Sequence, residues 1–216
     1  MYSEHKATFI ENWPKELLDL SFLSEGFELH ERDVIAIGAN THDFMNARGL
    51  LEKPLYSAQL REDIEYALSV LNKPAFLRFG GVSYHDYVRP RLETVDGVIE
   101  QLAVSNRRVA SYLWDCLQSS TPVWLYLREW REILRWGEFR CFIKEGKVIG
   151  VSQYHYLEYF PFIKEKENEI RLQLIAFLQK LLPVLHVDSV VADVAITYQD
   201  SEFATTLIEL NPFIQR

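Results

Sequence analysis

The chain has 216 residues and a mass of 25.4 kDa, enough for one large domain or two small lobes around a buried core. Its 48% hydrophobic and 25% charged residues are ordinary for a soluble globular protein, and no apolar run approaches the roughly 20 residues that span a membrane. A net charge of −8 and a pI near 5.3 argue against a nucleic-acid binder and against a protein that binds anionic membranes.

In the amino-terminal half, the spacing of apolar residues predicts alternating helices and strands. The segment Leu55–Leu71 carries apolar residues at helical spacing, and Asn72-Lys73-Pro74 ends that helix. The predicted elements of this half are, in chain order, a short helix at Lys15–Leu20, a strand at Asp33–Gly38, the helix Leu55–Leu71, a strand at Ala75–Phe79, helices at Thr94–Ala103 and Arg107–Leu117, and a strand at Pro122–Arg128.

In the carboxy-terminal half, two hairpins flank the longest helix. The first joins Glu138–Lys144 to Lys147–Gln153 around the turn Glu145-Gly146. The helix Lys164–Leu182 follows, with an apolar stripe made of Ile170, Leu172, Leu174, Ile175, Leu178 and Leu181. The fold class is therefore α+β with mainly antiparallel strands, divided into an amino-terminal lobe (1–120) and a carboxy-terminal lobe (121–216).

The second hairpin carries a candidate magnesium site. Asp193 lies in the apolar strand Val190–Val194, and the turn-rich residues Tyr198–Ser201 lead to the strand that holds Glu209 and Asn211. Alternate residues of a strand share a face, so Glu209 and Asn211 point the same way and Asp193 is expected beside them. Magnesium prefers such hard oxygen ligands and completes its shell with water and phosphate. The alternative is a solvated sheet face without a metal.

Basic residues on the predicted strands suit a polyphosphate. Arg78 and Arg128 lie near the ends of two strands, and Arg140 shares a strand face with Glu138 and Lys144. Guanidinium groups match phosphate oxygens in bidentate pairs, and a divalent ion between acids and phosphates would make both sets compatible. Ordinary cross-strand ion pairs on a wet sheet remain the alternative.

Several motifs make the sequence similar to the cell division cycle protein 123 family. They are Leu127–Trp130, the block Glu138–Gln153, the Tyr-Phe-Pro-Phe of Tyr159–Phe162 and the terminal Asn-Pro-Phe of Asn211–Phe213. The resemblance implies a divergent ATP-grasp fold, in which two α+β lobes clamp ATP and magnesium. It extends from about Phe76 to Phe213.

Carried over by position, the resemblance implies ATP contacts from Arg78, Ser83, Arg128 and Arg140. It implies magnesium ligation by Asp193, Glu209 and Asn211. Ser83 begins the loop Ser83-Tyr84-His85-Asp86, in which histidine stands where the family often has lysine. No catalytic nucleophile or base is identified.

Two functions stay open at this point. The first is an ATP-grasp ligase that activates an unknown carboxylate as an acyl phosphate. The second is a nucleotide-dependent assembly chaperone with a protein partner, as eukaryotic members that assemble translation initiation factor 2 imply. Many ATP-grasp ligases carry an arginine two residues before the first metal acid, where this chain has Val191. Val191 favours the second function, and the complete metal triad favours the first.

Two further expectations concern location and partners. Cys116 and Cys141 lack CxxC spacing, and the first residues lack a basic stretch followed by an apolar one, so a reduced, cytoplasmic chain is expected. The aromatic residues of the segment 154–162 form either a partner-binding patch or core packing against the following helix.

Overall fold

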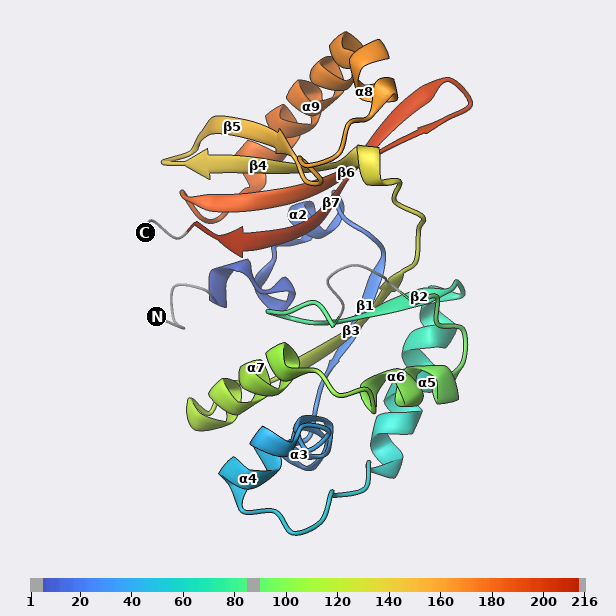
Figure 1. Cartoon of the computed structure of the whole chain (residues 1–216), viewed down its shortest axis with the longest axis vertical. Coiled ribbons are helices and arrows are strands. Elements are labelled where there is room, and N and C mark those ends of the chain that lie inside the picture. The colour runs from blue at the N-terminus through green and yellow to red at the C-terminus, as the bar shows by residue number, and fades with distance from the viewer. Residues whose placement is uncertain (1–5, 85–89, 214–216) are drawn as a thin grey trace. The chain divides into compact units, whose positions relative to one another are not determined.

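The computed structural model describes residues 6–84 and 90–213, so His85 and Asp86 lie outside the described residues. The chain forms two compact units (Figure 1). The middle unit comprises residues 23–130, and the terminal unit comprises residues 1–22 together with residues 131–216.

The middle unit contains a three-stranded antiparallel sheet in the order β1-β3-β2. One face of this sheet carries Leu77, Phe79, Leu125 and Leu127, all buried, and the ring of Tyr112 on α7 lies 6.1 Å from that of Phe79. The elements are β1 (Ser24–Glu28), α3 (Glu31–Gly38), α4 (His42–Arg48), α5 (Ala58–Leu71), β2 (Ala75–Phe79), α6 (Val95–Leu102), α7 (Arg107–Gln118) and β3 (Trp124–Glu129).

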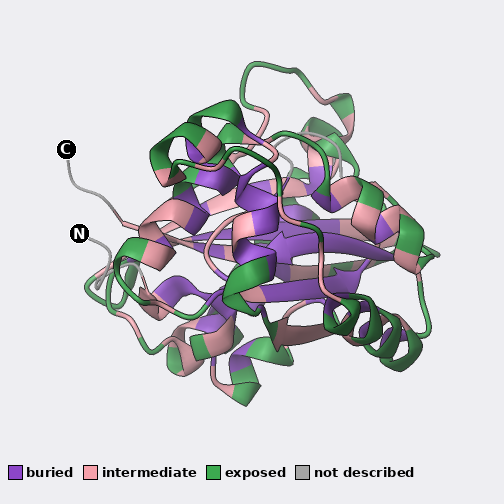
Figure 2. Cartoon of the chain, turned by 90° about the horizontal axis from the view of Figure 1, so that it is seen from below, coloured by how far each residue is buried: buried purple, intermediate pink, exposed green. Residues whose placement is uncertain are grey.

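The terminal unit contains a four-stranded antiparallel sheet in the order β5-β4-β6-β7. Side chains of β4 alternate between a buried face, with Phe139, Cys141 and Ile143, and a half-buried face. In Figure 2, buried residues gather on the strands, and exposed residues lie mainly on helices and loops. The elements are η1 (Lys6–Thr8), η2 (Ile10–Asn12), α2 (Lys15–Leu18), η3 (Arg135–Gly137), β4 (Glu138–Lys144), β5 (Lys147–Gln153), α8 (Pro161–Glu165), α9 (Glu167–Leu181), η4 (Leu182–Val184), β6 (Val190–Gln199) and β7 (Glu202–Pro212).

The α+β class with antiparallel sheets is confirmed, and so are both predicted hairpins. The unit boundaries differ from the predicted division after residue 120. β3 pairs with β1 and β2 and so belongs to the middle unit. The first residues join the terminal unit, where the Leu207 amide donates to the Leu20 carbonyl at 2.8 Å and Ser21 Oγ donates to the Leu207 carbonyl at 2.6 Å.

The predicted strand Asp33–Gly38 is wrong, because these residues belong to helix α3. Its β-branched residues suggested a strand, but Val34 and Ile37 are buried one helical turn apart. Asp33 is also buried and accepts hydrogen bonds from the Ser57 amide (2.7 Å) and hydroxyl (2.6 Å). The strand that does form here, β1, was missed, and so was α4.

The predicted helix Lys164–Leu182 is divided at Lys166 into α8 and α9. Part of its predicted stripe is also wrong, since Leu172 and Ile175 are exposed. Leu172 is two residues from Ile170, which turns it about 200° around the helix. Phe177 takes a buried position instead. Within the described ranges, no helix is both long and apolar enough to cross a membrane.

Both cysteines are expected to resist thiol reagents in the folded protein. Cys116 and Cys141 are fully buried, and burial raises the pKa of the Cys141 thiol to about 12. Because the thiolate is the reacting species, a colorimetric disulfide reagent at pH 8 should titrate no thiol until guanidinium is added, and then two. Rapid reaction of either thiol without denaturant would contradict this burial.

Candidate functional site

Strand pairing in the terminal unit brings the predicted metal ligands together. Asp193 on β6 lies directly opposite Glu209 on β7, and Val191 lies opposite Asn211. The register shifts after Asp193, which places both Leu207 and Ile208 in the core while Glu209 and Asn211 stay half-buried. The alternation predicted for this part of β7 is therefore confirmed, with a bulge beside the acids.

One amide group joins the two carboxylates. Asn211 Nδ2 donates to Asp193 Oδ2 at 3.1 Å and to Glu209 Oε1 at 2.9 Å. With the amide turned over, Asn211 would offer its oxygen at the same point. Three hard oxygen donors on neighbouring strand positions fit the type of ligand that magnesium takes. Among the described residues, no group of three or more His, Cys, Asp or Glu side chains is arranged for a metal, so this set has two carboxylates only.

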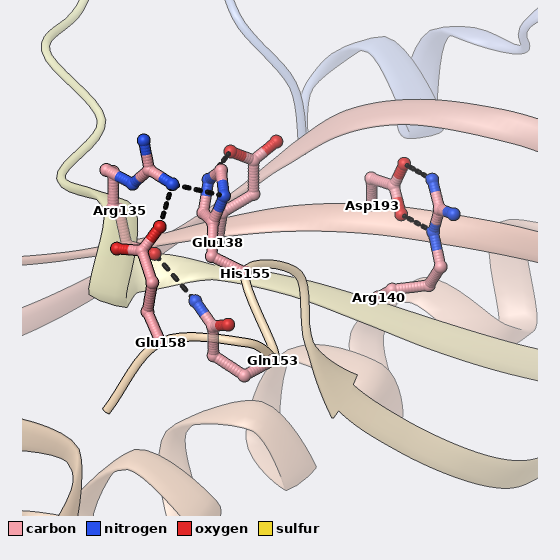
Figure 3. Close-up of polar contacts among 7 residues, drawn as sticks. All are labelled: Arg135, Glu138, Arg140, Gln153, His155, Glu158 and Asp193. Atoms are coloured by element: carbon pink, nitrogen blue, oxygen red, sulfur yellow. Dashed lines mark hydrogen bonds and ion pairs between the residues drawn. The ribbon is translucent and has the colours of Figure 1, made fainter. Parts of the chain in front are cut away.

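Arg140 on β4 pairs with Asp193 on the neighbouring strand. Its Nε donates to Asp193 Oδ1 at 2.8 Å and its Nη2 donates to Oδ2 at 2.7 Å (Figure 3). The guanidinium also lies over the Tyr154 ring, 4.9 Å from the ring centre. The sequence predicts phosphate contacts for Arg140, whereas the structure shows a bidentate ion pair with a predicted metal ligand.

The electrostatics of this cluster follow from burial. The Asp193 side chain is 2% exposed, and this desolvation raises its pKa to about 6. The hydrogen bonds from Arg140 oppose the shift, whereas the nearby Glu209 adds to it. Those same hydrogen bonds raise the pKa of Arg140. The carboxylate is thus held in a place where its charge needs a cationic partner.

The remaining predicted ATP contacts lie in the middle unit. Arg128 and Arg78 share the face of the sheet opposite to Leu125 and Leu127, as diagonal neighbours on β3 and β2, and both are buried. Arg128 Nε donates to Ser24 Oγ at 3.0 Å. Ser83 forms a bridge with Arg78, so the structure brings these three residues onto one part of the sheet. Arg140, Asp193, Glu209 and Asn211 belong to the terminal unit.

A second polar network, not predicted from the sequence, holds the segment after β5 (Figure 3). Arg135 forms an ion pair with Glu158 and lies 3.3 Å from His155 Nδ1, and His155 Nε2 lies 3.6 Å from Glu138 Oε2. Gln153 Nε2 donates to the Arg135 carbonyl at 2.7 Å. The charged residues around the first hairpin are the only sequence signal for this network. They could not identify its pairs, because the pairing depends on the fold.

The aromatic segment is partly packed and partly exposed. Phe162 packs beside Trp136 (4.5 Å between ring centres) and Tyr198 (5.4 Å), not in solvent. Tyr156, Leu157 and Tyr159 are 77%, 87% and 72% exposed. We name the segment that carries these three side chains, residues 156–159, the display loop.

A protein-family model described as D123 matches residues 98–216. The "Translation initiation factor eIF2 assembly protein" of Xenopus laevis is 39% identical over 90 residues, which cover 41% of this chain and 26% of that protein. "Cell division cycle protein 123" of Eremothecium gossypii is 36% identical over 109 residues, covering 49% and 30%. These alignments therefore span less than a third of each curated relative.

Among solved structures, Cdc123 from Schizosaccharomyces pombe is similar with a TM-score of 0.75 and 19% identity, over 98% of this chain and 85% of that one. At this identity the likeness shows the fold, and it confirms the resemblance that the motifs indicated. The D123 model matches more than half of the residues. The chain therefore belongs to the D123 family.

Proposed function

We propose that this chain is an assembly factor that binds ATP with magnesium and holds a protein partner in a nucleotide-dependent way. The observation that carries the nucleotide part is the convergence of Asp193, Glu209 and Asn211 through one amide group. Relatives described as assembling translation initiation factor eIF2 support the partner part, and eIF2 is the partner we propose.

In this proposal the terminal unit holds the ion. Asp193, Glu209 and Asn211 would ligate magnesium, which when bound would neutralise phosphate charge. Arg140 would contact the nucleotide beside the ion, and the contacts proposed for Arg78, Ser83 and Arg128 belong to the middle unit. Each charge-assisted bond from an arginine contributes roughly 1.5–3 kcal/mol when water is excluded, so each Arg→Ala change should weaken ATP binding about tenfold or more.

An ATP-grasp ligase acting through an acyl phosphate is the second candidate. The full set of metal ligands favours it, since binding alone places weaker demands on ligand number. Val191 favours the assembly factor, because it pairs with Asn211 beside the acids and places an apolar side chain where ligases often have an arginine.

Calorimetric titration with ATP, with and without magnesium, tests the nucleotide part. We expect ATP to bind more tightly when magnesium is present. If neither ATP nor magnesium binds the folded chain at millimolar concentration, the nucleotide part of the proposal is wrong. A turnover assay with and without purified eIF2 separates the two candidates. ADP formation with a new covalent product would select the ligase, and an ATP-dependent complex without turnover would select the assembly factor.

The display loop is our candidate for the partner surface. Its backbone is braced on both sides, since the Tyr154 amide donates to the Glu138 carbonyl at 2.8 Å and the Glu158 amide donates to the His155 carbonyl at 2.9 Å. The Arg135–Glu158 ion pair adds a further brace. Exposed aromatic and aliphatic side chains on a rigid support lose little conformational entropy when they enter a partner's pocket.

Replacing Tyr156 and Leu157 by Ser should weaken eIF2 binding about 700-fold or more, because two anchors of this size each contribute about 2 kcal/mol or more. Affinity is read by biolayer interferometry with ATP and magnesium present. Tyr66→Ser with Leu51→Ser is the matched control, since both side chains are exposed and belong to the middle unit. Equal affinity of the two double variants would remove the display loop from the interface.

A further inference from the structure

Arg140 occupies the oxygens that a metal ion would need. Both oxygens of Asp193 accept from its guanidinium, at 2.8 and 2.7 Å, and Oδ2 also accepts from Asn211 at 3.1 Å. The Asp193 side chain is 2% exposed, so little water can replace these donors. Unless Arg140 gives up one of its two hydrogen bonds, these contacts leave a cation no more than the second acceptor position of Oδ1.

A divalent ion that arrives without phosphate does not compensate Arg140 for a lost hydrogen bond. It would enter beside a positive guanidinium, and Arg140 would give up part of its bidentate pairing with Asp193. Like charges at short range in a poorly solvated place repel strongly. Because Arg140 already neutralises Asp193, the two carboxylates together form only a weak site for a free ion.

A polyphosphate changes this balance, because its oxygens suit a guanidinium in the same bidentate manner as a carboxylate. Arg140 is placed to make such a change, since its side chain is 35% exposed and its guanidinium lies on the Tyr154 ring. The ring stabilises one face of the guanidinium by a cation–π contact, so the N–H groups at the edge of the guanidinium can donate to an anion.

We propose that Arg140 is a specificity-determining residue that makes the Asp193–Glu209–Asn211 set reject a free divalent ion and accept one together with phosphate. This inference rests on the proposed function, because it concerns the same site. The ion and the nucleotide are then strongly coupled, each raising the affinity for the other by the same factor.

The test measures Mn²⁺ binding to the purified chain at pH 8, by the paramagnetic resonance signal of the unbound ion. Mn²⁺ is added alone and then with an ATP analogue that carries an imido bridge. The variants are Arg140→Gln, which removes the charge, and Arg140→Lys, which keeps the charge but loses the fork. Lys144→Gln is the matched control, since it makes the same change of charge on the same strand face.

The wild-type chain should bind Mn²⁺ alone at least 100-fold more weakly than with the analogue. Arg140→Gln should bind Mn²⁺ alone about tenfold more tightly than the wild type, and the ion–nucleotide coupling should shrink. Arg140→Lys should change in the same direction by about threefold, which tests the inference even if the glutamine variant does not fold. Lys144→Gln should match the wild type.

Unchanged or weaker binding of Mn²⁺ alone by folded Arg140 variants would overturn the inference, whatever the nucleotide does. Absence of analogue binding to the wild type, with or without the ion, would overturn the proposed function instead. The two failures therefore give different results.

Discussion

Replacing Asp193 by Asn together with Glu209 by Gln is expected to abolish the effect of magnesium on ATP affinity. Both proposed carboxylate ligands then become neutral amides, and hard divalent ions bind such a set poorly. The loss should amount to about 100-fold or more in the affinity measured with magnesium, from two charge-assisted interactions of roughly 1.5–3 kcal/mol each. ATP titrations by calorimetry, with magnesium and with a chelator, give this difference directly.

The matched control is Asp200→Asn with Glu202→Gln. These residues lie at the tip of the same hairpin, both are exposed, and the pair loses the same charge. The control should keep the wild-type response to magnesium. An equal response in the 193/209 variant, with circular dichroism showing a folded chain, would remove both acids from the ion site.

Replacing Gly137 by Ala should destabilise the terminal unit by about 3 kcal/mol, which corresponds to a fall of roughly 12–15 °C in its Tm. A Cβ at this position would lie 2.1 Å from the Ile196 carbonyl oxygen on β6. A backbone oxygen in a paired strand has little room to withdraw, so β4 and β6 must separate. Thermal unfolding followed by circular dichroism measures the change.

Gly150→Ala provides the comparison within the same sheet. A Cβ there would meet nothing closer than a Phe142 ring carbon at 3.9 Å, which is ordinary contact. Its Tm should stay within about 2 °C of the wild type, because small changes at uncrowded surface positions have little effect. If both alanine variants unfold at the same temperature, the close approach at Gly137 is not a constraint on the fold.

The closeness of Asp193, Glu209 and Asn211 was easier to predict than the fold around them, because the three residues are close in the sequence. Asp193, Glu209 and Asn211 lie on two strands joined by a short turn, so the period of a strand was enough to place them on one face. The partner of Arg140 could not be read in the same way. That ion pair depends on β4 lying beside β6, 53 residues apart, which is a property of the sheet order.

The errors in the middle unit have a related cause. Val34 and Ile37 favour strands by intrinsic propensity, but packing in α3 decided their conformation. Ser24–Glu28 has little strand propensity and becomes β1 because β3 offers it a paired edge. Where tertiary contacts outweigh local preference, a single sequence holds too little information to choose the element.

The union of residues 1–22 with residues 131–216 has a consequence for synthesis of the chain. The middle unit is continuous, so a ribosome can release it as a complete folding unit while the terminal unit still lacks its sheet. The hydrogen bond from Ser21 to Leu207 cannot form until Leu207, 186 positions later, has been translated. Asp193 on β6 and Glu209 on β7 follow the other described elements of the terminal unit in the sequence, so these two acids can meet only after those elements have been translated.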